Sequence, residues 1–300
     1  MKIFGHCRFS YFGLSDTGRA IKNLEHAQRL LWNPQRMAVR FHLFEHLLLP
    51  ALAGQTNPDF TMVITSSAAM PDIYHERLER LTRAVPQIRL LRTEAPTIAD
   101  ALLPILREAS DDQTNPSVHF RVDDDDAIST DYVARLPNAA WRVDPGGMIS
   151  FPNGVIGFID QGVAKHAPHH MPDIAIGLAL VNAPDSRQDP FSIQHRRHGR
   201  RVPGYRDPTH PSFHYTLHLA NNTSGYREDG QILPPEVTNP RVQITYQLFP
   251  ELAKDQVAAP PADDWIAAAF PYTSGPDLRR NLERAGNPLA LAEEMGFPLP

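Results

Sequence analysis

The sequence is poor in cysteine and has no long apolar run. It contains one cysteine, Cys7, which excludes an internal disulfide framework and is typical of a reducing compartment. Its longest apolar stretch, residues 47–53, is far shorter than the ~20 residues that a helix needs to cross a bilayer. No hydrophobic signal-peptide region follows Met1. We therefore expect a cytoplasmic protein without a membrane span.

The chain also has only a small excess of negative charge. The 29 Lys and Arg against 34 Asp and Glu give a formal net charge of −5, which does not favour a protein that binds the phosphates of nucleic acid. We expect a small-molecule partner and no nucleic acid. The hydrophobic fraction of 42% is sufficient to bury the core of one large domain.

Segments typical of strands and helices alternate through the first half of the chain. β-branched and aromatic residues predict strands over residues 3–12, 60–64, 88–91 and 117–122. Apolar residues at spacings of 3 and 4 predict helices over residues 37–52, 74–85 and 98–106. This alternation predicts an α/β fold with a mostly parallel central sheet, in which the carboxyl ends of the strands face the ligand.

The pattern changes after residue 140. Asn153 and Gly154 separate two apolar runs, 146–151 and 155–159, which predicts an added antiparallel hairpin. For the histidine cluster His166, His169 and His170 we expect a polar surface loop, because no cysteine or Glu motif accompanies its zinc-like spacing. Alanine and proline at 258–262 suggest a linker, so we divide the chain into a domain of residues 1–255 and a C-terminal helical appendage of residues 256–300.

Four consecutive aspartates, residues 123–126, follow the fourth predicted strand and precede apolar residues. Adjacent carboxylates about 4 Å apart repel by roughly 4 kcal/mol at an effective dielectric near 20, so a partly buried run needs a counter-charge. A divalent cation would supply it, and Mg²⁺ or Mn²⁺ suits such oxygen ligands. If the strand stays extended, Asp123 and Asp125 face one side and Asp124 and Asp126 the other. The alternative is a solvated acidic loop.

Three blocks of the sequence resemble one family. They are Arg8 to Ser10, residues 44–60, and residues 121–127 with the acidic run. In this order they resemble the bacterial rhamnosyltransferase family, which consists of nucleotide-sugar-dependent glycosyltransferases of the GT-A type with a D-x-D motif. The resemblance covers roughly residues 1–225. It implies a GT-A-like, Rossmann-like fold, a Mn²⁺ or Mg²⁺ cofactor, a UDP- or dTDP-sugar donor such as a rhamnose donor, and a glycan or surface-polysaccharide acceptor.

The resemblance also implies roles for individual residues. Asp123 would contact the donor ribose or the metal, and Asp125 would be a direct metal ligand, with Asp124 and Asp126 as the rival pair. A later histidine would complete the metal site, and we choose His218 over His214. The remaining residues expected to bind the donor are Arg8, Ser10, Ser66 and Arg121.

Three questions stay open at this level. Asp160 is a candidate for the carboxylate base that an inverting enzyme needs. The basic residues 195–201 would form either a lid over the diphosphate or a solvated loop. The acidic run would also suit a Mg²⁺-dependent phosphohydrolase or nucleotidyltransferase, or a non-catalytic module that binds glycan or Ca²⁺.

Overall fold

A computed structural model describes residues 1–13, 23–110, 114–160, 163–192, 203–218, 220, 266–271 and 275–299. Among these residues, seven strands form a central sheet in the order β10-β6-β9-β4-β1-β2-β3. Their bounds are β1 Lys2–Arg8, β2 Thr61–Ser67, β3 Ile88–Thr93, β4 Ser117–Arg121, β6 Met148–Ser150, β9 Leu178–Asn182 and β10 Gly204–Arg206. The predicted α/β class with a mostly parallel central sheet is confirmed.

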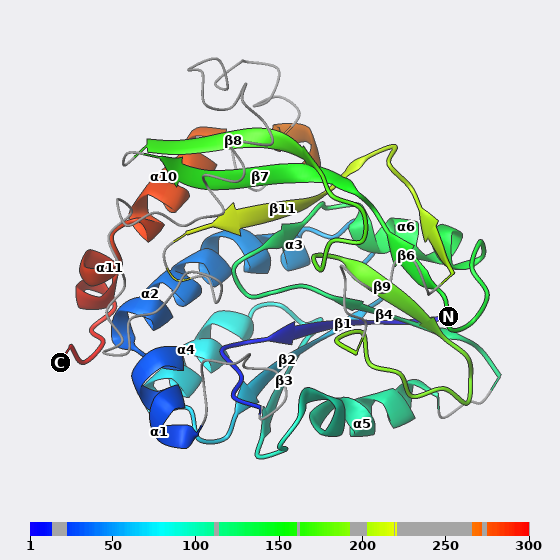
Figure 1. Ribbon diagram of the computed structural model, residues 1–300, viewed down its shortest axis with the longest axis horizontal. Helices are drawn as coiled ribbons and strands as arrows, with labels where there is room; N and C mark the ends of the chain where they lie inside the picture. The colour runs from blue at the N-terminus through cyan, green and yellow to red at the C-terminus, as the bar shows by residue number, and fades with distance from the viewer. Residues whose placement is uncertain are drawn as a thin grey trace.

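The four predicted parallel strands lie together on one side of this sheet (Figure 1). β1 pairs in parallel with both β2 and β4, and β3 pairs in parallel with β2. β9 is antiparallel to β4 and extends the sheet towards β6 and β10. Because His6 is in register with Arg121, the residues that follow β1 and β4 meet at one edge.

A second sheet lies beside the first, in the order β5-β11-β7-β8. Its strands are β5 Ala127–Ile128, β7 Asn153–Asp160, β8 Val163–His170 and β11 Pro211–Leu217. An antiparallel hairpin is present as predicted, but its strands are β7 and β8, and the predicted turn was wrong. Asn153 and Gly154 begin β7, and a Cβ on Gly154 would collide with the backbone of Phe213 on β11. This glycine allows close strand approach rather than a turn.

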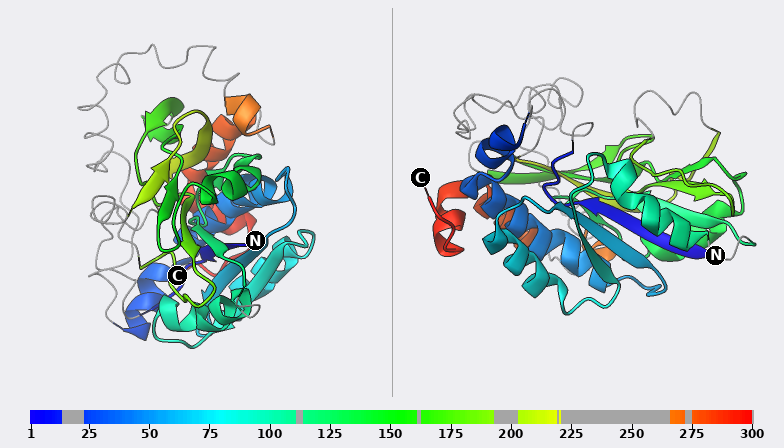
Figure 2. Two further views of the ribbon diagram at one scale, coloured as in Figure 1. Left: turned by 90° about the vertical axis from the view of Figure 1, so that its right-hand side faces the viewer. Right: turned by 90° about the horizontal axis from the view of Figure 1, so that it is seen from below.

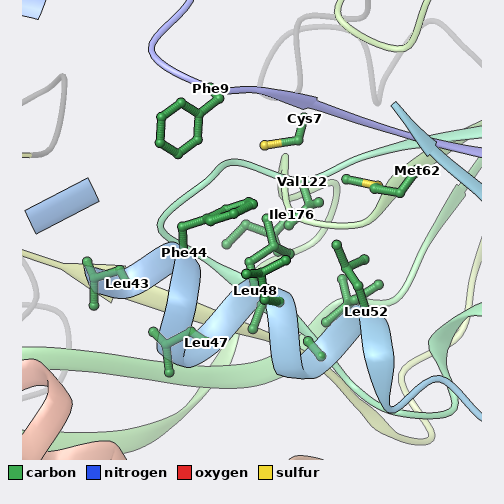
Figure 3. Packing of buried hydrophobic residues seen from close by; sticks show 14 of the residues in the cluster. Cys7, Phe9, Leu43, Phe44, Leu47, Leu48, Leu52, Met62, Val122 and Ile176 are labelled. Carbon is green, nitrogen blue, oxygen red and sulfur yellow. The ribbon is translucent and has the colours of Figure 1, made fainter. Parts of the chain in front are cut away.

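One long helical segment lies between the two sheets (Figure 1). It runs through α2 Pro34–Leu43, the π-helical η3 Phe44–Leu48 and α3 Leu49–Ala53. Asn33 caps its first turn by accepting hydrogen bonds from two backbone N–H groups, and it ends at Gly54 as predicted. In Figure 3, Phe44, Leu48 and Leu52 point towards the side of Cys7 and Met62, whereas Leu43 and Leu47 point the other way. The helix is therefore apolar on both sides.

The other helices cover the remaining faces. α5 packs on the opposite face of the central sheet, where its apolar residues cluster with Phe4 and Val63. α10 and α11 contact α2 and contribute Leu278, Leu282 and Leu291 to the same hydrophobic core as the sheets (Figure 2). The bounds are α1 Leu24–His26, η2 Ala27–Leu31, α4 Asp72–Thr82, α5 Ile98–Ala109, α6 Tyr132–Ala140, α10 Gly275–Ala285 and α11 Pro288–Glu294.

Two parts of the sequence prediction are not covered by this description. The predicted domain boundary at residue 255 and the linker at 258–262 lie outside the described residues, so the two-domain division stays a prediction. Within the described part of the chain, no helix is both long enough and apolar enough to cross a membrane.

Gly5 lies where β1 passes between two large side chains. A Cβ at this position would collide with Met62 Sδ and lie 2.5 Å from Phe120 Cζ. We expect Gly5→Ala to lower the free energy of unfolding by roughly 1–3 kcal/mol, because an overpacked core must shift its side chains. Urea denaturation measures this change. An unchanged midpoint would contradict the packing described here.

Candidate active site

The acidic run forms a turn between β4 and β5. The N–H of Asp126 donates to the carbonyl of Asp123 at 3.2 Å, and Asp124 and Asp125 occupy the turn. The extended conformation of β4 therefore stops before the second aspartate. The alternation of side chains that we expected from strand geometry does not hold, because Asp124 and Asp125 contact the same partner.

That partner is Arg40, a buried residue of α2. Its guanidinium forms ion pairs through Nη2 with Asp124 and through Nη1 with Oδ2 of Asp125. An arginine thus supplies the counter-charge that the sequence suggested a metal would supply. Sequence reasoning missed this residue, although Arg40 stands between apolar residues in a helix that is buried from Arg36 to Leu43. A cation in such surroundings is almost always paired.

His218, at the end of β11, contacts the carboxylate of Asp125 as well. Its Nε2 lies 2.9 Å from Oδ2 of Asp125, and the N–H of Ala220 donates to its Nδ1 at 3.1 Å. Because Nδ1 accepts, the proton of the neutral ring is on Nε2, and Nε2 donates to Asp125. The structure therefore brings two predicted site residues, Asp125 and His218, into direct contact.

These contacts determine which groups are charged. Burial favours the neutral form of Asp125, but the Arg40 charge and the His218 hydrogen bond outweigh it and lower the pKa of Asp125 to about 2. Burial and the charges of Asp125 and Asp123 raise the pKa of Asp126 well above its usual range. Burial also lowers the pKa of His218, so we take its ring as neutral at pH 7. The centre then holds an ionised Asp125 between a cation and a neutral donor.

The four aspartates differ in what remains open to a ligand. Asp124 is fully buried on Arg40, and Oδ1 of Asp126 accepts the N–H of Thr216 at 2.9 Å. The side chain of Asp123 is 38% exposed and lies 3.9 Å from Arg8. Asp125 is buried as well, against Arg40 and His218, so Asp123 is the one partly exposed member of the four aspartates.

Two arginines, Arg8 and Arg121, end β1 and β4 and lie on the α5 side of the central sheet. The guanidinium of Arg8 lies 4.5 Å from the ring centre of Phe191, and that of Arg121 lies 5.4 Å from it. Asp189 fixes the turn that presents this ring, because its carboxylate accepts from the N–H groups of Phe191 and Ser192. Burial lowers the pKa of Arg121 to about 10, so it stays cationic. Phe191 was not among the sequence candidates and has no motif that marks it.

The two predicted serines lie at the expected strand ends but are buried. Ser10 has a positive φ of 45°, and its hydroxyl accepts from Nη1 of Arg36 at 2.9 Å. Ser66 is 3% exposed. Its neighbour Ser67 accepts the N–H of Phe12 at 2.7 Å and so ties the loop after β1 to β2. That Ser10 and Ser66 line a nucleobase pocket stays a prediction.

The remaining candidates lie elsewhere. Asp160 is the last residue of β7 in the second sheet. The basic segment 195–201 lies outside the described residues. The predicted surface loop at 166–170 was wrong, because these histidines belong to β8 and His166 is buried. His166 is in register with Gly157, where a Cβ would meet Leu282 and His214, and the ring centres of His166 and His214 lie 5.6 Å apart.

Comparison with known proteins identifies the family. Residues 2–229 match the family described as "Putative rhamnosyl transferase". The chain belongs to this family and is a glycosyltransferase. None of the curated proteins compared matches the chain.

Solved structures resemble this glycosyltransferase more distantly. The S. aureus TarS 1–349 structure with UDP-GlcNAc is 10% identical with a TM-score of 0.43, and the match covers 99% of this chain and 93% of that one. The structure of the same TarS region with UDP is 9% identical with a TM-score of 0.39 and covers 95% and 90%. A 4-diphosphocytidyl-2C-methyl-D-erythritol synthase is 14% identical with a TM-score of 0.27 and covers 61% and 73%. Similarity this distant carries no information about substrates.

Proposed function

We propose that this glycosyltransferase moves a sugar, rhamnose being the one its family description names, from a UDP- or dTDP-sugar to a glycan acceptor with the help of Mn²⁺ or Mg²⁺. The observation that supports this most directly is the ionised Asp125 at the carboxyl end of β4, in contact with His218 and next to the half-exposed Asp123. Ligands of α/β sheets bind at this edge.

The chemistry of the donor set fits such a metal. Within the described residues, no three His, Cys, Asp or Glu side chains are grouped closely enough to hold a metal by themselves. Mg²⁺ sites of this kind commonly use one or two carboxylates and take their other ligands from water and substrate phosphates. Asp123 and Asp125 would supply those carboxylates, and the donor diphosphate would complete the site.

That His218 is a metal ligand stays a prediction, and it requires a different protonation of the ring. Ligation through Nε2 needs the proton on Nδ1, which faces the N–H donor of Ala220. In the arrangement described, His218 instead orients Asp125 by a hydrogen bond. A ligand role would require the backbone at Ala220 to turn.

The chain's own residues would act on the leaving diphosphate. A bound metal would offset the negative charge that develops on it. Arg8, whose side chain is 25% exposed, adds a fixed positive charge at the same edge, and Phe191 restricts its guanidinium. Asp160 remains the proposed base for an inverting reaction.

A thermal-shift panel tests the proposal. Wild-type protein is heated with UDP, dTDP, GDP or CMP, each with and without Mn²⁺. We expect one nucleoside diphosphate to raise the melting temperature only with Mn²⁺, since a ligand at a hundred times its dissociation constant stabilises the folded state by about 2.7 kcal/mol. With the matching nucleotide-sugar, release of the nucleoside diphosphate would support glycosyl transfer. Cleavage between the phosphates, or no shift with any nucleotide, would contradict the proposal.

A further inference from the structure

Arg40 occupies the position of a cation in the centre of the acidic run. One guanidinium contacts two neighbouring carboxylates, those of Asp124 and Asp125. The side chain of Arg40 is 5% exposed, and those of its partners are as deeply buried. A planar guanidinium suits this bridging role because its N–H donors form a rigid fork.

The oxygen that Arg40 contacts is also the one that His218 contacts. Nη1 of Arg40 and Nε2 of His218 both donate to Oδ2 of Asp125. A divalent cation that approached this oxygen would meet one full positive charge and one N–H proton. Asp123, on the outer side of the turn, has its own arginine neighbour in Arg8 at 3.9 Å. Each carboxylate that could bind a metal is therefore partly compensated by protein.

We infer that Arg40 is the resident cation of this site: it prevents a free divalent ion from binding Asp125, so that metal is admitted only together with the diphosphate of the donor. This inference rests on the proposed function for the identity of the ligand. The diphosphate brings the negative charge that overcomes the repulsion by Arg40. Free metal alone lacks it.

The alternative role for Arg40 is to hold Asp125 in place for the metal, and the two roles predict opposite effects. If orientation dominated, removal of Arg40 would weaken metal binding. The charge of Arg40 repels a divalent ion strongly at close range in a buried setting. Without Arg40, His218 and Thr216 would still hold Asp125 in place. We therefore expect removal of Arg40 to tighten the binding of free metal.

Four variants separate charge, contact and folding. Arg40→Gln removes the charge, and Arg40→Lys keeps it. The double variant Arg40→Gln with Asp124→Asn leaves no unpaired buried aspartate at residue 124, so it guards against loss of the fold in the single variant. Arg77→Gln is the matched control, because Arg77 is also a helix residue paired with a carboxylate, Glu45 at 2.9 Å, away from the acidic run.

The experiment is a titration of Mn²⁺ followed by the electron paramagnetic resonance of the free ion, alone and with UDP or dTDP. We expect wild type, Arg40→Lys and Arg77→Gln to bind Mn²⁺ at least about tenfold more weakly without nucleotide than Arg40→Gln does. The double variant, which has the net charge of wild type, is expected to bind free Mn²⁺ at least about threefold more tightly than wild type. Melting curves show which variants are folded.

The outcomes separate the two proposals. Free Mn²⁺ binding that is equally tight in wild type and in the folded variants without Arg40, or weaker in those variants, would overturn the role of Arg40. If wild type binds no Mn²⁺ with either nucleotide while removal of Arg40 still creates a site for free Mn²⁺, Arg40 does exclude free metal, but entry of metal with the diphosphate and the proposed function are both wrong.

Discussion

Asp125→Asn is expected to lower kcat/KM roughly 10²–10³-fold, the loss typical when one group that stabilises charge in the transition state is removed. It is also expected to abolish the Mn²⁺-dependent thermal shift. The substitution keeps the shape of the side chain and removes the ionised oxygen that Arg40 and His218 hold. Arg40 retains Asp124 as a partner, so no unpaired buried cation results. Steady-state transfer from the donor that the panel selects gives the rate, and the melting curve gives the fold.

Asp144→Asn is the matched control for this prediction. Asp144 is an exposed aspartate of the same domain. Its backbone carbonyl accepts a hydrogen bond from the N–H of Gly147 at 2.9 Å, and the substitution leaves this carbonyl unchanged. The control should keep both the thermal shift and the rate. If Asp125→Asn also kept them, the acidic run would have a structural role and the donor site would lie elsewhere.

The second large effect is acid unfolding between pH 6.5 and about 4. Burial lowers the pKa of His42 and of His214 to about 3, and that of His119 to about 4. The unfolded chain takes up protons at these residues near pH 6.5, and the folded protein does not. Their contribution to stability is therefore full above pH 6.5 and is lost as the pH falls.

The size of this effect follows from the width of the pH interval. At pH 5 each of the three histidines costs up to about 2 kcal/mol, and together about 6 kcal/mol, out of the 5–15 kcal/mol by which a typical domain is stable. We expect the urea midpoint to fall steeply between pH 7 and pH 5. A midpoint that stays constant over this range would contradict the neutral, buried state of these rings.

His214→Phe isolates one of the three contributions. Among the described residues, neither ring nitrogen of His214 has a hydrogen-bond partner, and the ring packs against Phe270 at 6.0 Å. Phenylalanine keeps the shape without a titrating group. We expect roughly one third less pH dependence, with equal or higher stability at pH 7. A pH dependence identical to wild type would assign the acid sensitivity to other groups.

The acidic run shows where sequence reasoning stops. Period-2 alternation paired Asp123 with Asp125 and Asp124 with Asp126, but it assumes that the strand continues. The chain instead turns at Asp124, so the alternation no longer applies. Asp124, Asp125 and Asp126 are all buried in protein contacts, so the choice between the two pairs stays a prediction.

A similar limit explains the histidines of β8. These histidines are interspersed with lysine and proline, as in an exposed loop. No local sequence rule distinguishes such a loop from a strand that pairs with a glycine-containing strand. The space above Gly157, opposite His166, is filled by His214 and Leu282, and the ring of His166 is buried beside His214. A contact of this kind depends on a residue in another strand.

The sequence by itself determined the alternating α/β order, the long apolar helix ending at Gly54 and the acidic run after the fourth strand. It did so because backbone periodicity and burial are local properties of a segment. The tertiary structure decided which charges meet. Arg40 and His218 are 85 and 93 residues from Asp125 along the chain, and they meet it because α2 and the end of β11 both reach the turn between β4 and β5. Which cation pairs with a carboxylate depends on the distance between them in space, and the order of residues along the chain does not give that distance.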